Sequence, residues 1–269
     1  MSLTRRSFIK RGAVALAGVA VAGGGWSYVR GLLAPGGTSI ARASNGAQQD
    51  SHDLSGQRWA FVVDNTKCIG CGKCLEACKR ENDVPLEPQF NRTWVERYVE
   101  DEHGETYVDS PDGGIHGFDS EPGNVKYRNI HVARSFFVPK LCNQCENPPC
   151  VQVCPVSATY KTEDGVILVN RSRCIGCGYC IQACPYGARF LDPRFRVADK
   201  CTWCYHRISR AQAPACVEVC PVGARLFGDP SDPESPVAKV LRQRGVGVLK
   251  PGLGTRPRVF YVGLETEVR

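Results

Sequence analysis

Apolar runs along this chain are few and short. Residues 59–64 and 166–170 each predict a β-strand, and the polar segment 163–165 predicts a turn before the second of them. So little of the sequence alternates or repeats in a regular apolar pattern that the predicted core is small. A chain of 269 residues with such a core needs another source of stability.

The C-terminal region predicts one helix and one further strand. Ser235 followed by Pro236 is typical of a helix N-cap and first helical residue, and Gly245 is a stop signal. Residues 258–263 predict an edge strand. We expect residues 222–269 to form a C-terminal tail.

Sixteen cysteines interrupt this pattern, and they fall into four groups of four with none left over. The first and third groups share the spacing C-x2-C-x2-C-x3-C, the second has two extra residues before its third cysteine, and the fourth has an eleven-residue insert there. In chain order the groups are Cys68, Cys71, Cys74 and Cys78; Cys142, Cys145, Cys150 and Cys154; Cys174, Cys177, Cys180 and Cys184; and Cys201, Cys204, Cys216 and Cys220. The shared spacing is the bacterial ferredoxin run, whose thiolates hold [4Fe–4S] clusters.

Disulfides and zinc are the alternatives for these cysteines. A disulfide framework has no reason to repeat one spacing, and cysteines two residues apart rarely bridge without strain. Zinc is the stronger competitor, because paired C-x2-C units form tetrahedral thiolate sites. Three cysteines within seven residues instead suit three corners of a cubane, and glycines such as Gly70, Gly72, Gly176 and Gly178 let the loop curl around it. The sequence therefore predicts four [4Fe–4S] clusters with all sixteen cysteines as iron ligands.

The motifs also predict how the clusters are grouped. In two-cluster ferredoxins the fourth cysteine of each run ligates the other cluster, so motifs must pair. We therefore predict an α+β fold with two ferredoxin-like dicluster units, an inserted segment and the C-terminal tail. Residues 63–74 parallel residues 169–180, which indicates duplication. Three groups end in Cys-Pro, whereas Cys78 is followed by Lys79, so we expect a differently shaped wall around the cluster of the first motif.

Residues 79–141 separate the first two motifs and contain no cysteine. Strand-like runs at 93–99 and 132–138 enclose a polar stretch, rich in glycine and aspartate, from 100 to 124. A surface excursion without a role is one interpretation. The other, which we favour, is a docking surface for a partner subunit.

The N-terminus predicts export. The segment from Thr4 to Lys10 (TRRSFIK) matches a twin-arginine signal, an apolar stretch follows, and Ala41 to Ala43 is a candidate cleavage site. An uncleaved membrane anchor stays an alternative. Export of a folded chain reconciles thiolate ligands with the oxidising periplasm, where free cysteines otherwise form disulfides. We predict a periplasmic protein that is associated with the membrane through a complex.

The signal segment also explains the basic charge. Residues 1–43 hold six basic and no acidic residues, so the net charge falls from +7 to +1 without them. No nucleic-acid partner is expected from such a balance. Four basic residues beside the motifs offset the charge of the clusters or are simply solvated: Lys67, Lys73, Arg173 and Lys200.

Motifs for substrate chemistry are absent from the sequence. There is no P-loop, dinucleotide fingerprint, nucleophile–base arrangement or C-x-x-C-H haem motif. This favours a non-catalytic electron-transfer subunit of an oxidoreductase complex over a self-contained enzyme.

Three segments around the motifs carry a family resemblance: 141–155 (LCNQCENPPCVQVCP), 180–189 (CIQACPYGAR) and 198–207 (ADKCTWCYHR). The chain resembles the iron–sulfur (beta) subunits of membrane-associated molybdopterin oxidoreductases, the group of the DMSO, polysulfide and tetrathionate reductases. Residues 248–255 (VLKPGLGT) and 259–264 (VFYVGL) are most similar to tetrathionate reductase beta subunits.

The resemblance implies crossed ligand sets and two partners. The implied sets are Cys68, Cys71, Cys74 and Cys220; Cys201, Cys204, Cys216 and Cys78; Cys142, Cys145, Cys150 and Cys184; and Cys174, Cys177, Cys180 and Cys154. The implied partners are a molybdopterin-containing catalytic subunit and an integral membrane, quinone-reactive subunit, with electrons relayed between them. Alternatives are the iron–sulfur subunit of a periplasmic hydrogenase or of a membrane complex linked to sulfite reduction, and a free polyferredoxin carrier.

These expectations divide the chain into six parts. They are a signal peptide at 1–43, the first motif at 44–78, the insertion at 79–141, a ferredoxin-like unit with motifs two and three at 142–190, the fourth motif at 191–221, which pairs with the first, and the tail at 222–269.

Overall fold

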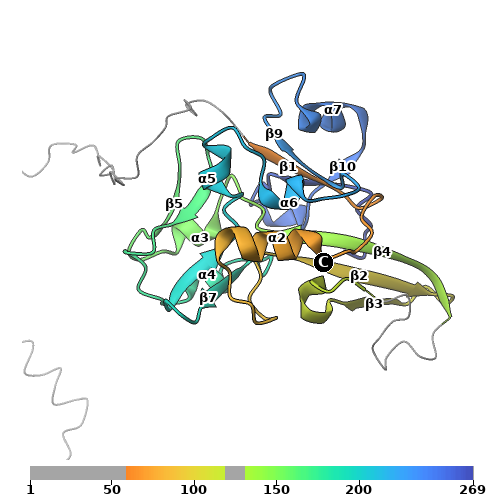
Figure 1. The fold of residues 1–269 in the computed structure, drawn as a ribbon, viewed down its shortest axis with the longest axis horizontal. Helices are drawn as coiled ribbons and strands as arrows, with labels where there is room; N and C mark the ends of the chain where they lie inside the picture. The colour runs from red at the N-terminus through yellow and green to blue at the C-terminus, as the bar shows by residue number, and fades with distance from the viewer. Residues whose placement is uncertain (1–58, 119–130, 269) are drawn as a thin grey trace, which may run out of the picture. The chain divides into compact units, whose positions relative to one another are not determined.

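The computed structural model describes residues 59–118 and 131–268, which belong to one compact unit (Figure 1). The predicted signal peptide and cleavage site lie outside the described residues, and so does the part of the polar stretch from 119 to 124. Over the described ranges, no helix combines the length and the apolar character needed to cross a membrane.

A four-stranded sheet surrounds the strand that leads into the first motif. That strand, β1 (Ala60–Asp64), is buried along its whole length and confirms the prediction at 59–64. The strand order is β10 (Val246–Gly247), β11 (Val259–Val262), β1 and β9 (Arg225–Gly228), with β11 parallel and β9 antiparallel to β1. A C-terminal strand therefore completes the sheet of the first strand.

The strand predicted at 258–263 exists as β11, but its prediction as an edge strand was wrong. It lies between β1 and β10, and Val259, Tyr261 and Val262 are buried. The run is apolar at successive positions because both of its faces are covered: Val259 and Tyr261 pack in one apolar cluster, and Phe260 and Val262 pack in another. Helix α7 (Pro236–Gln243) begins directly after Ser235, as predicted, and its Val237 packs on this sheet against Val62.

The insertion forms a three-stranded antiparallel sheet in the order β3 (Thr106–Asp109), β2 (Thr93–Asp101), β4 (Val132–Leu141). Strands β2 and β4 confirm the two predicted strand-like runs, whereas β3 and the 3-10 helix η1 (Pro111–Gly114) lie in the stretch expected to be a polar loop. Figure 1 shows this sheet at one end of the described unit, with the short hairpins at the other end.

Two hairpins connect the remaining motifs. Strand β5 (Thr159–Lys161) pairs with β6 (Ile167–Val169), which confirms the strand predicted at 166–170, and the turn between them contains residues 163–165. Strand β7 (Arg189–Asp192) pairs with β8 (Val197–Lys200).

The strand pairings follow one rule around the molecule. Each motif is preceded by one strand and followed by another: β1 and β2 flank the first motif, β4 and β5 the second, β6 and β7 the third, β8 and β9 the fourth. The strand after one motif pairs antiparallel with the strand before the next, and β9 pairs with β1 to close the cycle. Four sequence-local loops are thereby held by pairings between neighbouring motifs.

The motif helices share one starting point. They are α2 (Lys73–Asn82), α3 (Pro149–Gln152), α4 (Tyr179–Gln182) and α6 (Ala215–Glu218), and the third cysteine of each motif is the second residue of its helix. The fourth motif also has α5 (Tyr205–Ile208), and η3 (Pro251–Leu253) lies in the tail. Helix α2 packs against α6, and α3 packs against α4.

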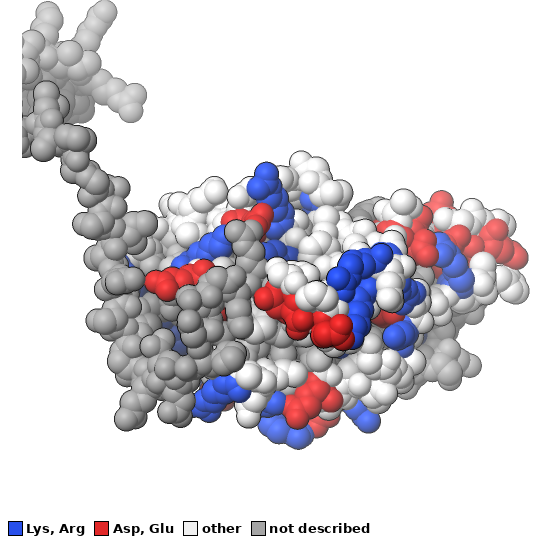
Figure 2. Space-filling view, turned by 90° about the horizontal axis from the view of Figure 1, so that it is seen from above, with Lys and Arg blue, Asp and Glu red and all other residues white. Residues whose placement is uncertain are grey.

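The outer surface mixes charges of both signs. On the face shown in Figure 2, basic and acidic side chains lie next to one another in small groups rather than in one large patch of a single sign. Exposed ion pairs occur among the described residues, such as Arg80 with Glu76 at 2.5 Å. Exposed pairs of this kind contribute little to stability.

Candidate metal-cluster sites

The structure brings Cys68, Cys71 and Cys74 together with Cys220 of the fourth motif. These four line a space of about 340 Å³ between the first motif and the loop after α6, and Arg225 lies at its wall. Cys220 belongs to a different motif from the other three, so the packing of α2 against α6 brings this group together.

A second space, of about 310 Å³, is lined by Cys201, Cys204 and Cys216 together with Cys78. Cys78 is buried on α2 and reaches this group from the first motif. Asn82, Arg92 and Trp203 also line the space. The first and fourth motifs therefore each contribute their fourth cysteine to the space that the other motif lines.

Cysteines of the second and third motifs also lie near one another. Burial, followed by the neighbouring thiols of Cys142, Cys150 and Cys184, raises the pKa of Cys145 to about 12, which places these four cysteines in one group. Cys174 and Cys180 belong to one small apolar cluster. Helix α3, which Cys154 follows, packs against α4 of the third motif, and this contact brings Cys154 towards Cys174, Cys177 and Cys180.

Two of the four cysteine groups line a space between them. None of the sixteen forms a disulfide. Over residues 59–118 and 131–268, no three His, Cys, Asp or Glu side chains lie close enough together to hold a single metal ion. A zinc site needs four ligands at about 2.0–2.3 Å from one ion. The spaces that two of the cysteine groups line suit a cluster with several metal ions.

Glycine is required where the motif loops turn. Gly72 has a φ of +73°, and a Cβ there would lie 2.3 Å from the carbonyl oxygen of Ile115. Gly176 has a φ of +69°, and its Cβ would lie 2.4 Å from the carbonyl oxygen of Arg196. A side chain at either position would be strained and would also push away the segment that covers the loop. In the first motif that segment comes from the insertion.

Burial opposes ionisation of eight of the sixteen thiols in the absence of a positive charge. It is the main cause that raises the pKa of Cys68 and Cys216 to about 11 and that of Cys201 to about 12. Because iron binds the thiolate, loading must displace these protons, and the charge of the metal must stabilise the thiolates. Folding and loading are thus coupled.

Backbone amides point at the fourth cysteines of three motifs. The N–H of Ala158 donates to the Cys154 sulfur at 3.2 Å, and the N–H of Ala224 donates to the Cys220 sulfur at 3.3 Å. The amide of Ala188 likewise interacts with Cys184 and acts to lower its pKa, although burial raises it. Each alanine ends a Cys-Pro-x-x-Ala run.

Two buried arginines are the main residues that the cysteine motifs did not predict. Arg225 and Arg189 each follow Cys-Pro-x-Gly-Ala and begin the strand after their motif. Arg225 donates to the Thr93 hydroxyl at 2.9 Å, and Arg189 donates to the Thr159 hydroxyl at 3.3 Å. Each threonine begins the strand after the first or second motif. Extending the cysteine repeat by one residue would have found both arginines.

The two arginines fit an anionic group between their cysteines. Cys74, Cys216 and Cys68 raise the pKa of Arg225 against the effect of its burial, and Cys150, Cys142, Cys180 and Cys184 do the same for Arg189. One nitrogen of each guanidinium (Nη1 of Arg225, Nη2 of Arg189) is buried without a hydrogen-bond partner from the described part of the protein. A cluster sulfur beside each nitrogen would supply the acceptor that buried donors require.

Of the four basic residues considered from the sequence, only Lys200 is buried. Its ammonium donates to the carbonyl oxygens of Ile167 and Cys201. Lys67, Lys73 and Arg173 are not buried. These three are solvated surface charges. Lys200 is the one of the four that is placed to offset negative charge near the cysteines.

The groups also lie in a definite order. Among the neighbours of Cys216 is Cys74, and among those of Cys201 is Cys142. Arg189 has neighbours in both the Cys142 and the Cys180 groups. The order is therefore the first motif, the fourth, the second and the third. Cys71 and Cys177, at the two ends, are exposed, whereas Cys78, Cys201, Cys204 and Cys216 are buried.

Comparison with protein families supports the cluster interpretation. Two family models, each described as a 4Fe-4S dicluster domain, match residues 67–158 and 133–230. Together they cover all four motifs. The predictions of two dicluster domains, an α+β fold and four [4Fe–4S] clusters are confirmed.

Several characterised proteins are similar over most of the chain. The B subunit of tetrathionate reductase from Salmonella typhimurium is 42% identical over 77% of this chain and 73% of its own length. The protein of the same name from Archaeoglobus fulgidus is 45% identical over 78% of this chain and 84% of its own. The B subunit of polysulfide reductase from Wolinella succinogenes is 39% identical over 77% and 94%, respectively.

Proposed function

The chain is a member of the family of iron–sulfur B subunits that includes those of the tetrathionate, polysulfide and dimethyl sulfoxide reductases, and we propose that it connects a molybdopterin-containing catalytic subunit to a quinone-reactive membrane subunit. As a member of this family it is an electron-transfer subunit with four [4Fe–4S] clusters. Each cluster, when bound, accepts and releases one electron at a time.

The observation that carries the proposal is the order of the cysteine groups. Two groups end at exposed cysteines, Cys71 and Cys177, and the groups between them are mostly buried. Exposed isoleucines, Ile69 and Ile175, flank the two ends. A free carrier needs one accessible centre, whereas a chain with two accessible ends suits a subunit placed between two partners.

We assign the iron ligands as crossed sets. The first is Cys68, Cys71, Cys74 and Cys220; the second is Cys201, Cys204, Cys216 and Cys78; the third is Cys142, Cys145, Cys150 and Cys184; the fourth is Cys174, Cys177, Cys180 and Cys154. The first and second sets each line one common space, which supports their assignment. The contacts of α2 with α6 and of α3 with α4 support the pairing of the motifs. The matched pairs Arg225–Thr93 and Arg189–Thr159 support two equivalent units in which the first motif pairs with the fourth and the second with the third.

The protein's own groups prepare each site. Backbone amides at Ala158 and Ala224 stabilise negative sulfur, and the buried arginines balance charge between two sites. Trp203, which is 1% exposed, and Phe61 keep water away from the second set. These groups act by orientation and electrostatics, and they require no substrate pocket on this chain.

The insertion is our candidate for a docking surface. Val108 on β3 and Val132 on β4 are 48% and 46% exposed, at the end of the molecule where the sheet extends (Figure 1). Deleting residues 100–124 would also remove Gly114 and Ile115, which pack on Gly72. Substituting both valines with glutamate is a cleaner test, with Leu253→Glu as an exposed control. Unchanged assembly of the double variant would rule out docking at this surface.

Export and membrane association complete the proposal. The twin-arginine segment supports transport to the periplasm of a chain already loaded with clusters. Replacing Arg5 and Arg6 with lysine is expected to leave the loaded protein in the cytoplasm, as judged by cell fractionation. A periplasmic location of that variant would contradict the assignment.

Purification from the native membrane tests the function as a whole. Full-length protein, tagged at the C-terminus and extracted in mild detergent, is expected to elute with a molybdenum-containing subunit and an integral membrane subunit. Elution with a nickel-containing hydrogenase, or alone, would contradict the proposal. Metal analysis of the eluted complex distinguishes these results.

A further inference from the structure

Helix α2 differs from the other motif helices in where it ends. In α3, α4 and α6 the fourth cysteine follows two residues after the helix, and the proline after that cysteine disfavours helical backbone before it. Lys79 follows Cys78 instead, so α2 continues to Asn82. Residues four apart lie on one face of a helix, and Asn82 therefore stands one turn beyond Cys78.

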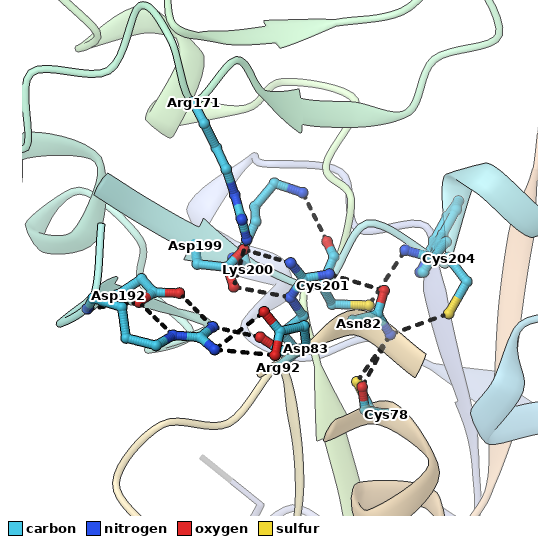
Figure 3. Close-up of polar contacts among 12 residues, drawn as sticks. Cys78, Asn82, Asp83, Arg92, Arg171, Asp192, Asp199, Lys200, Cys201 and Cys204 are labelled. Carbon is cyan, nitrogen blue, oxygen red and sulfur yellow. Dashed lines mark hydrogen bonds and ion pairs between the residues drawn. The ribbon is translucent and has the colours of Figure 1, made fainter. Parts of the chain in front are cut away.

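The Asn82 amide faces two sulfurs of the same cysteine group. Its Nδ2 lies 3.6 Å from the Cys78 sulfur and 3.5 Å from the Cys204 sulfur, and it also donates to the Cys78 carbonyl oxygen at 3.1 Å (Figure 3). Asn82 lines the space that Cys78, Cys201, Cys204 and Cys216 surround. One side chain thus bridges the two motifs that form this group.

A buried ion pair fixes which end of the amide faces the sulfurs. Arg92 Nη1 donates to the Asn82 oxygen at 2.9 Å. Its Nε and Nη2 donate to the two oxygens of Asp199 at 3.0 and 2.8 Å, and both residues are buried. The amide oxygen is held by a cation, so the NH₂ group must point to the sulfurs. Figure 3 shows how Arg92 connects the other two side chains.

The lysine after Cys78 supports the same arrangement. The Lys79 ammonium is buried and donates to the carbonyl oxygens of Pro85 at 2.6 Å and Phe90 at 2.7 Å. These bonds hold the loop that leads from α2 back to Arg92. Lys79 therefore has two effects: it permits the extra helical turn and it fastens the segment that orients Asn82.

The first motif is thus distinguished by its donor. In the other three motifs the fourth cysteine is approached by a backbone amide, which belongs to Ala158, Ala188 or Ala224. At Cys78 the contact is made by a side-chain amide. A backbone donor is present whatever the residue, whereas a side-chain donor depends on residue 82.

We propose that Asn82 sets the reduction potential of the cluster held by Cys78, Cys201, Cys204 and Cys216, and that Arg92 and Asp199 position it. This rests on the ligand set proposed above. Reduction adds negative charge to a cluster, so a donor on its sulfurs stabilises the reduced form and raises the potential. The amide acts on a buried site, where water offers little competing hydrogen bonding.

The test is a potentiometric EPR titration of the intact complex with Asn82→Leu. Leucine has a similar size and no donor. The midpoint potential of one cluster is expected to fall while the other three keep theirs, with iron content unchanged. The shifted signal must be the one that Cys216→Ser removes. A shift in a different cluster, or no shift in any, overturns the proposal.

Asn82→Asp provides the second variant. A carboxylate keeps an acceptor for Arg92 but replaces the donor with a negative oxygen beside the thiolates. The potential of the same cluster is expected to fall further than in Asn82→Leu. A rise in that potential would contradict the proposed electrostatic effect, and loss of iron from both variants would show that Asn82 is a structural residue. Either result overturns the proposal.

Asn91→Leu is the matched control, because Asn91 lies next to Arg92 in sequence and its amide donates to the Pro88 carbonyl oxygen. It is expected to leave all four potentials unchanged. Iron analysis of the unsubstituted protein tests the proposed cluster content separately from the proposed effect of Asn82. Fewer than about sixteen irons per chain, at four per cubane, would contradict the proposed cluster content whatever Asn82 does.

Discussion

The first and third motifs have the same cysteine spacing and the same Cys-Ile-Gly-Cys-Gly start, yet their helices differ in length. Helix α2 contains ten residues and α4 contains four. Within the run they differ at positions 73/179, 75/181 and 76/182, and directly after the fourth cysteine the first motif has Lys79 where the third has Pro185. A proline there ends the helix, and a lysine allows another turn.

The difference after the fourth cysteine changes how that cysteine is stabilised. In the third motif the chain turns after Pro185 and presents the Ala188 amide to Cys184. In the first motif the helix carries Asn82 over Cys78, and the loop that follows returns as Arg92. Ligand spacing alone therefore does not determine the surroundings of a cluster; the residue after the last ligand also does.

The largest effect is expected from breaking the crossed pairing. Cys220→Ser should remove the cluster held mainly by the first motif, because Cys220 completes the group of Cys68, Cys71 and Cys74. Cys184→Ser should in the same way remove the cluster of the second motif. EPR of the reduced proteins distinguishes the missing signals. Loss of only the fourth motif's own cluster in Cys220→Ser would contradict the pairing.

Removing a buried arginine should have the next largest effect. Arg225→Gln leaves the sulfurs of two sites without their nearby cation, and loss of one partner of a buried pair costs about 3–5 kcal/mol. The free energy of unfolding of the loaded protein, followed by the cluster absorbance in denaturant, measures this. Arg189→Gln is the counterpart in the other unit, and we expect a similar loss there. A cost in only one of the two variants would show that the units are not equivalent.

Lys79→Pro gives the first motif the local sequence of the third. Proline inside α2 removes a helical hydrogen bond and clashes with the preceding turn, at a cost of about 3 kcal/mol or more. The buried ammonium and its bonds to the loop are also lost. We expect a lower denaturation midpoint and loss of the effect of Asn82 on its cluster. A variant with unchanged stability would mean that α2 does not need its last turn.

Pro185→Ala is the reverse change, and its effect should be the smallest. Alanine frees the unfolded chain and lowers stability by about 0.4–1 kcal/mol. The Ala188 amide stays available to Cys184, so the potentials should not move. A shift in the potential of the cluster that Cys184 binds would show that Pro185 acts on that cluster directly.

Much of the site was predictable because its signals are local. The cysteine spacing, the strands at β1, β2, β4 and β6, and the start of α7 all follow from short sequence patterns. The lysine after Cys78 predicted a different wall around a cluster, but it did not by itself predict the extra turn of α2. Asn82 could have been placed on the Cys78 face by helical periodicity once that turn was assumed.

The remaining features depend on contacts distant in sequence. Arg92 and Asp199 are 107 positions apart, and no local pattern pairs them. Strand β11 lies between β1 and β10. An apolar run in the sequence predicts a strand, but it does not show which other strands will pair with it. Arg189 and Arg225 were partly predictable. Both follow the repeated Cys-Pro-x-Gly-Ala sequence, but only the fold shows that both are buried beside cysteines.

Iron and sulfide analysis together with EPR of the full chain tests the central claim most directly. Four [4Fe–4S] clusters predict about sixteen irons and sixteen inorganic sulfides per chain, and four EPR signals that appear on stepwise reduction. A zinc-loaded, EPR-silent protein would contradict the account.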